Sequence, residues 1–154
     1  MRRIWATPGL DDLPVAEWRT LLAHLAKLGF AGIEPLIANP YALPADTIHA
    51  LLRESRLAIT GLRTGAIATI HGVTLNHPDP EVRSEAVARL QEVIHYGAQF
   101  GWPHILVGLI QGPLAQEQTV TQARKHIVGS LRLCAEEAAQ HGMEIDLEPV
   151  NRYE

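Results

Sequence analysis

Short apolar runs alternate with longer amphipathic runs along this 154-residue chain, and this alternation constrains its fold more than any other feature. The short runs are typical of strands, and the longer runs repeat apolar residues every three or four positions, as one face of a helix does. Strands are expected at residues 3–6, 31–37, 57–62, 104–110 and 143–148, and helices at 14–28, 44–56, 80–100 and 116–140. This order predicts a parallel α/β sheet with right-handed crossovers.

The helix that begins at Pro80 has the clearest boundary signals. Asp79 suits the N-cap position, and proline suits the first turn because its missing N–H would have no partner there. Gly101 is expected to end this helix. Residues 63–78, which contain two glycines and two histidines, are expected to form a long connection before it.

Two architectures fit this order of elements. A flavodoxin-like sheet has about five strands, whereas a (β/α)₈ TIM barrel needs eight strand–helix units. Acidic residues alternate with apolar ones along 143–148, which suits a barrel strand better than a strand covered by helices on both faces. Residues 6–12 also lack a glycine pattern that would hold a phosphate. The sequence therefore predicts one incomplete (β/α)₈ domain over residues 1–154, truncated after its fifth strand.

Composition narrows the class of protein. Apolar residues make up 47% of the chain, which suits a folded globular domain. The single cysteine, Cys134, cannot form an internal disulfide and fits a reducing compartment. We expect no membrane segment, no signal peptide and a cytoplasmic location, since no long apolar run is present. A formal net charge of −4 gives no attraction to nucleic acid.

The fifth expected strand carries the strongest chemical signal. Glu148 lies at its carboxyl end, where barrel enzymes build their active sites, and Glu154 follows six residues later. One carboxylate can bind a hard divalent cation while the other holds a substrate hydroxyl. A solvated acidic strand end explains the same spacing equally well.

Three segments resemble those of a known family. Residues Leu147–Glu154 look like the strand-five motif of the sugar phosphate isomerase/epimerase family, the xylose-isomerase-like TIM barrels. Leu28–Glu34 resembles the second strand of that family, and Asn76–Arg83 resembles the start of its third helix. The strand-five motif is fairly specific, and the other two add weight because they occur in the same order.

The resemblance implies a role in carbohydrate metabolism: the isomerisation or epimerisation of a sugar or sugar phosphate through an enediolate. Family members hold one divalent metal (Mn, Mg, Co or Zn) with Glu, Asp, His and Glu from strands five to eight. Glu148 matches the first of these, which is both a metal ligand and a catalytic acid/base. Glu154 matches a glutamate that contacts substrate oxygens. The three remaining ligands have no counterpart in this chain.

Three further residues are candidate substrate contacts. Glu34 ends the second expected strand, His71 follows the third, and Arg152 can meet a phosphate or pair with Glu154. His71 also matches a zinc-binding histidine of the apurinic endonuclease branch. That branch has a second histidine after strand four, where residues 107–112 contain none, so a nuclease is a weaker alternative.

An isolated half barrel would expose two unpaired strand edges and an open apolar face. The 154 residues are therefore expected to be part of a longer protein, the product of a truncated gene, or one half of a barrel that another chain completes. Alone, we expect the chain to be inactive, to self-associate or to bind a completing chain. A non-catalytic barrel half that assembles with a partner is the alternative function. Cys134 and the helical histidines are interpreted as packing and surface residues, respectively.

Overall fold

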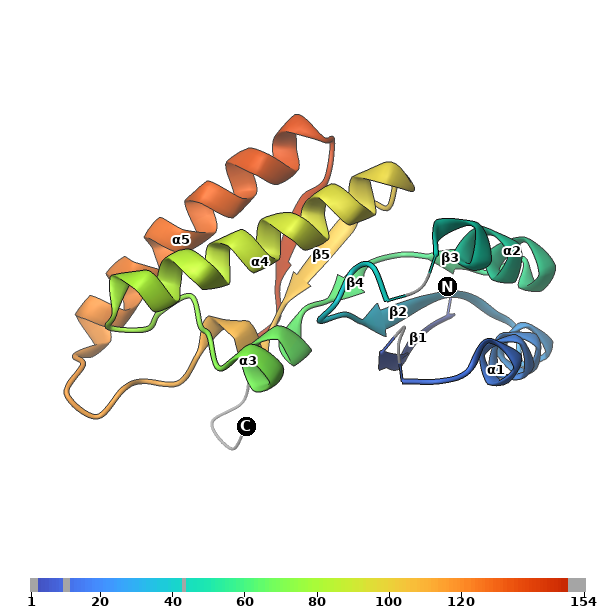
Figure 1. The fold of residues 1–154 in the computed structure, drawn as a ribbon, viewed down its shortest axis with the longest axis horizontal. Helices are drawn as coiled ribbons and strands as arrows, with labels where there is room; N and C mark the ends of the chain where they lie inside the picture. The colour runs from blue at the N-terminus through green and yellow to red at the C-terminus, as the bar shows by residue number, and fades with distance from the viewer. Residues whose placement is uncertain (1–2, 10–11, 43, 150–154) are drawn as a thin grey trace.

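The computed structural model describes residues 3–9, 12–42 and 44–149. Helices α1 and α2 lie together beside the first strands, and α4 and α5 lie together beside the last two (Figure 1). The elements are β1 (Arg3–Gly9), α1 (Val15–Lys27), β2 (Phe30–Leu36), α2 (Ala45–Ser55), β3 (Ala58–Ile59), β4 (Leu62–Arg63), α3 (Gly65–His71), α4 (Pro80–Gln99), β5 (His104–Val107), the 3₁₀ turn η1 (Leu109–Gln111), α5 (Val120–Gln140) and β6 (Glu144–Leu147).

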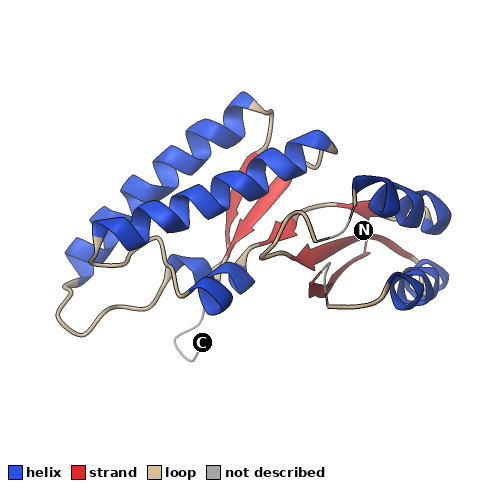
Figure 2. Ribbon diagram, in the orientation of Figure 1, coloured by secondary structure: helices blue, strands red, loops and turns tan. Residues whose placement is uncertain are grey.

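The strands form one parallel sheet in the order β1-β2-β4-β5-β6, with β3 also paired to β2. Figure 2 shows the strands in the middle of the view, with α4 and α5 to one side and α1 and α2 to the other. The predicted parallel α/β order is therefore confirmed. The single strand expected at 57–62 was wrong, because β3 and β4 are separate short strands. Between them Gly61 packs so closely on Leu106 of β5 that a Cβ at position 61 would overlap that side chain.

Four other boundaries differ from the sequence prediction. The strand expected at 3–6 continues through Pro8 to Gly9. The connection expected at 63–78 contains α3, which is too short to show helical periodicity and ends at Gly72 with a left-handed φ of 68°. The strand expected at 104–110 stops at Val107, where the chain turns into η1. Helix α5 begins at Val120 rather than at residue 116, because Thr119 and Gln122 form a reciprocal capping box.

One face of the sheet packs against the helices. In β5, Ile105 and Val107 are fully buried, whereas His104 and Leu106 on the opposite face are only partly buried. In β6, Ile145 packs against the hydrophobic core and its acidic neighbours Glu144 and Asp146 are exposed. The predicted alternation thus separates an apolar face toward the helices from a polar face turned away from them.

Buried hydrogen bonds fix the loops at the carboxyl end of the sheet. The Asn76 side chain donates to the carbonyl oxygens of Gly112 at 3.0 Å and Pro113 at 2.9 Å. Gln118 donates to the Asn76 carbonyl at 2.7 Å, and Ser130 on α5 donates to that of Leu75 at 2.8 Å. These bonds join the loop before α4 to the loop after β5, so both loops have a defined position next to the strand ends.

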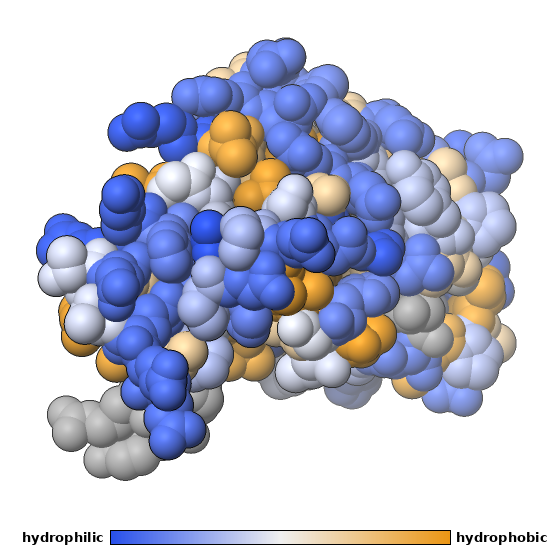
Figure 3. Space-filling view, turned by 60° about the vertical axis from the view of Figure 1, so that its left-hand side comes forward, coloured by the Kyte–Doolittle hydropathy of each residue, from blue (hydrophilic) through white to orange (hydrophobic). Residues whose placement is uncertain are grey.

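Apolar side chains remain exposed at both edges of the sheet. Ile4 and Trp5 are exposed on β1, Leu147 is exposed on β6, and Leu133 is exposed on α5. On the face shown in Figure 3, hydrophobic residues form separate patches within a largely hydrophilic surface. Within the described residues, none of the helices combines the length and the apolar character needed to cross a membrane.

The burial of α4 leads to a stability prediction. Leu90 is 0% exposed, so Leu90→Ala removes buried methyl groups and leaves a cavity. We expect the free energy of unfolding to fall by about 2–5 kcal/mol, measured by urea denaturation. Leu133→Ala is the matched control, because Leu133 is 53% exposed and its truncation is expected to change stability by less than about 0.5 kcal/mol. Equal losses in the two variants would contradict this packing.

The buried thiol of α5 leads to a second prediction. Cys134 is fully buried, and burial raises the pKa of its thiol to about 12. The thiol therefore stays protonated at neutral pH, where the thiolate is the reactive form. We expect no reaction with a soluble aromatic disulfide reagent at pH 8 until the protein is unfolded. Rapid labelling of the folded protein would show that Cys134 is accessible.

Candidate functional site

Glu148 lies one residue beyond β6, at the carboxyl end of the sheet. Its backbone N–H donates to the Val107 carbonyl at 3.0 Å, which continues the pairing with β5. The Gln111 side chain donates to the carbonyl of Val107 at 2.9 Å and to that of Glu148 at 2.8 Å. Backbone and side-chain bonds therefore hold the main chain of Glu148, while its carboxylate stays exposed.

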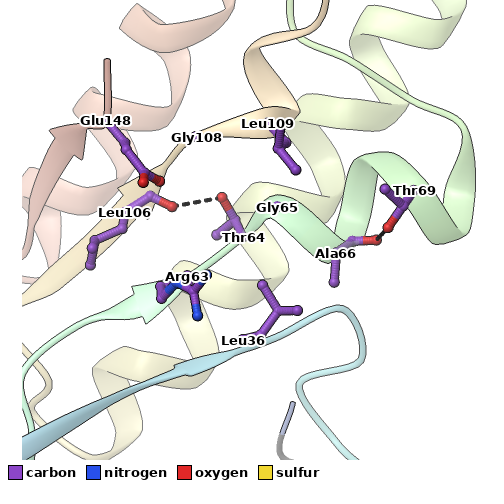
Figure 4. A pocket seen from close by; sticks show the side chains of 10 residues that line it. All are labelled: Leu36, Arg63, Thr64, Gly65, Ala66, Thr69, Leu106, Gly108, Leu109 and Glu148. Carbon is purple, nitrogen blue, oxygen red and sulfur yellow. Dashed lines mark hydrogen bonds between the residues drawn. The ribbon is translucent and has the colours of Figure 1, made fainter. Parts of the chain in front are cut away.

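A cavity of about 370 Å³ lies beside this carboxylate. Figure 4 shows α3 on one side of the cavity, with Glu148 and Leu106 on the other. The lining residues come from four strand ends and α3: Leu36, Arg63, Thr64, Gly65, Ala66, Thr69, Leu106, Gly108, Leu109 and Glu148. A Cβ at Gly108 would lie 2.5 Å from a carboxylate oxygen of Glu148, so the glycine leaves room for the acid.

Arg63 is the charged residue of the cavity lining that our sequence reasoning missed. It ends β4, and its guanidinium donates to the Thr7 carbonyl of β1 at 3.4 Å. Within the described ranges no ion pair joins Arg63 to Glu148, so the cavity presents a separate cation and anion. Glu148 was selected because it lies at the carboxyl end of a strand. The same reasoning, applied to the third expected strand, would have identified Arg63.

Two predicted site residues lie near the cavity but outside its lining. Glu34 does not end the second strand as expected, because β2 continues to Leu36. It is half-buried and accepts a hydrogen bond of 3.3 Å from the Thr60 hydroxyl. His71 is the exposed last residue of α3, two positions beyond Thr69, which does line the cavity. Arg152 and Glu154 lie outside the described residues.

The residues around these candidates have structural roles. Gln111 donates to two backbone carbonyls. Trp102 is buried and stacks on Phe100, so it packs in the core. Asp146 lies on the same side of β6 as Glu148, with its carboxylate 3.2 Å from His104 Nδ1.

Whether the site can bind a metal depends on the ligand atoms that its residues offer. Among the described residues, Glu148 supplies the only carboxylate that lines the cavity. A carboxylate oxygen suits Mg²⁺, Mn²⁺ or Zn²⁺, but a stable site for any of them needs several ligands. Glu148 therefore fits as one ligand of a site that needs further donors.

Several known proteins are similar to this chain. It is 28% identical over 147 residues to an L-ribulose 3-epimerase from Methylomonas sp. (strain DH-1), which covers 93% of this chain and 49% of that protein. The D-allulose 3-epimerase structure from Methylomonas sp. in complex with D-allulose matches with a TM-score of 0.77 and 24% identity. The match covers 98% of this chain and 52% of the epimerase chain.

The structure of a 3-keto-D-glucoside 4-epimerase from E. coli matches with a TM-score of 0.74 and 20% identity. The match covers 99% of this chain and 57% of the E. coli chain. The two structural matches establish the fold alone, and it is the fold that the sequence predicted. This chain spans about half the length of these relatives. The family model of the xylose isomerase-like TIM barrel matches residues 22–154, and the chain belongs to that family.

Proposed function

We propose that this chain forms part of the active site of a metal-dependent sugar or sugar-phosphate epimerase or isomerase. The observation that carries the proposal is the position of Glu148: an exposed carboxylate beside a cavity at the carboxyl end of a parallel sheet. The related L-ribulose and D-allulose 3-epimerases favour a free ketose as the substrate. In this proposal residues 1–154 are one incomplete barrel domain, and the protein is cytoplasmic.

Glu148 has two roles in the proposed chemistry. It is one ligand of a divalent metal (Mn, Mg, Co or Zn), which when bound supplies Lewis-acid polarisation of the substrate carbonyl. Its carboxylate also takes the proton from the carbon next to that carbonyl, which leaves an enediolate. Return of a proton to the other face of the same carbon inverts its configuration. That second transfer needs an acid that the cavity does not contain among its described residues.

Arg63 is the proposed anchor for substrate oxygens. Its guanidinium lies in the same cavity as Glu148 and carries donors suited to hydroxyl or phosphate oxygens. Glu34 and His71 are proposed outer contacts, as are Arg152 and Glu154 in the segment that follows Glu148. Together they would orient the sugar so that its reacting carbon faces the Glu148 carboxylate.

The missing ligands are proposed to come from outside residues 1–154. One carboxylate does not hold a catalytic metal, and β1 and β6 are edge strands with exposed apolar residues. Further residues of a longer protein, a completing chain or a second copy would pair these edges and supply the remaining donors. If none of these supplies them, the alternative applies, and this is a non-catalytic barrel half.

The test uses the protein purified from its own cells with whatever completes it. We expect it to interconvert ketoses epimeric at carbon 3, with D-allulose and L-ribulose as the probes, and to lose activity on chelation. Glu148→Gln removes the carboxylate that accepts the proton, and kcat is expected to fall by about 10²–10⁴-fold.

Glu144→Gln is the matched control for that experiment. Glu144 is an exposed acid on the same strand and the same side as Glu148, but it does not line the cavity. Its substitution is expected to leave kcat unchanged. An active Glu148→Gln protein would contradict the proposed role of Glu148. A purified assembly without activity on ketoses or their phosphates would favour the non-catalytic alternative.

A separate prediction concerns Gln111, which positions the main chain of Glu148. Gln111→Leu removes both side-chain bonds to the carbonyls of Val107 and Glu148, at about 1 kcal/mol each. We expect the amide of Glu148 to exchange hydrogen roughly tenfold faster or more, measured by NMR. Gln99→Leu, an exposed change at the end of α4, serves as the control. Unchanged exchange at Glu148 would show that Gln111 does not hold this segment.

A further inference from the structure

A second cluster of ligand-type side chains joins α4 to α5. His95 Nε2 lies 2.7 Å from Oε1 of Glu137, and His141 Nε2 lies 3.4 Å from the same oxygen. The two imidazole rings are nearly perpendicular, with centroids 5.3 Å apart. One ligand atom from each of the three residues falls within 4.8 Å of the others.

This cluster lies at the end of the sheet opposite the cavity. His95 is in the last turns of α4, and His141 follows the last residue of α5. Both helices lead directly into strands that begin there, β5 at His104 and β6 at Glu144. Glu148 lies at the other end of β6, so the cluster is separate from the proposed active site.

We propose that His95, Glu137 and His141 bind one divalent transition-metal cation, with Zn²⁺ as the best fit. Two imidazole nitrogens and one carboxylate oxygen form a donor set that Zn²⁺ uses, with water in the fourth position. Imidazole donors favour zinc and its neighbours in the first transition series over Mg²⁺ or Ca²⁺.

Two of the three ligand separations are close to those around a bound ion. In a tetrahedral site with bonds of about 2.0–2.1 Å, ligand atoms lie about 3.3 Å apart. The His141–Glu137 separation of 3.4 Å already matches this value, and the His95–Glu137 separation of 2.7 Å must widen by a few tenths of an ångström. The three side chains are 49%, 23% and 36% exposed, in the order His95, Glu137, His141, so they can move and the ion can enter from solvent.

The arrangement of the helices favours this site over an ordinary surface ion pair. Glu137 and His141 are four residues apart and therefore share one face of α5, and His95 approaches them from a neighbouring helix. An exposed His–Glu pair alone contributes little stability. Three donors that converge from two helices let one bound ion crosslink α4 to α5.

Among the described residues, a second group of this kind is a weaker candidate. His104, Glu144 and Asp146 have ligand atoms that also lie within 4.8 Å of one another. This second group contains one imidazole and two exposed carboxylates, which suits a transition metal less well. The test below therefore distinguishes Zn²⁺ binding at this second group from binding at the His95, Glu137 and His141 cluster.

The experiment is a calorimetric titration of Zn²⁺ into the metal-free 154-residue chain. We expect one Zn²⁺ per chain, with affinity reduced at least tenfold in His95→Gln and in His141→Gln. His24→Gln is the matched control, an exposed histidine of α1 outside the cluster, and it is expected to bind Zn²⁺ as the parent does. Glu148→Gln is expected to bind equally well, which separates this site from the proposed active site.

A second readout locates the ion directly. On addition of Zn²⁺, the imidazole NMR signals of His95 and His141 are expected to shift together, with little change at His104. Zn²⁺ should also raise the melting temperature of the parent but not of His95→Gln, because the ion binds only the folded pair of helices. Unchanged binding in both cluster variants, or binding that is lost in His104→Gln or Glu148→Gln, would overturn the proposal.

Discussion

Burial of one face of the parallel sheet against the helices is the constraint on which the rest of this structure depends. Because side chains alternate along a strand, burying Ile105, Val107 and Ile145 turns the intervening residues to the opposite face. Because all the strands are parallel, their carboxyl ends meet at one edge. Arg63 and Glu148 are 85 positions apart in the sequence and still line the same cavity.

Hydrogen bonds in the loops convert this arrangement into a defined site. Asn76 ties the loop before α4 to the loop after β5, and Gln111 ties η1 to the backbone of Glu148. The side chains of Asn76 and Gln111 have hydrogen-bond partners within the protein. The Glu148 carboxylate, in contrast, has no ion-pair partner among the described residues. The scaffold is thus fixed, and the reactive group remains accessible.

The sequence predicted what local pattern determines, and it missed what tertiary contacts determine. Alternating apolar runs were enough to predict the parallel order and the strand-end position of Glu148, whereas the family was inferred from the resemblance of three segments to its motifs. The apolar runs did not predict the break between β3 and β4, or the close packing of Gly61 between them on Leu106. Helix α3 was missed because seven residues show no periodicity. The cluster of His95 with Glu137 was invisible because 42 positions separate the two residues.

The central claim is that Glu148 is a metal ligand beside the cavity. The most direct test is to locate where a hard divalent ion binds on this sheet. The measurement uses the protein together with whatever completes the site, because one carboxylate does not hold the metal alone. Paramagnetic broadening of backbone amide signals by Mn²⁺ then maps that position without requiring turnover. The account predicts broadening at the residues around the cavity, including Gly108, Leu109 and Glu148, and its loss in Glu148→Gln. Broadening at the cavity that persists in Glu148→Gln, or the absence of broadening there in the parent protein, would contradict it.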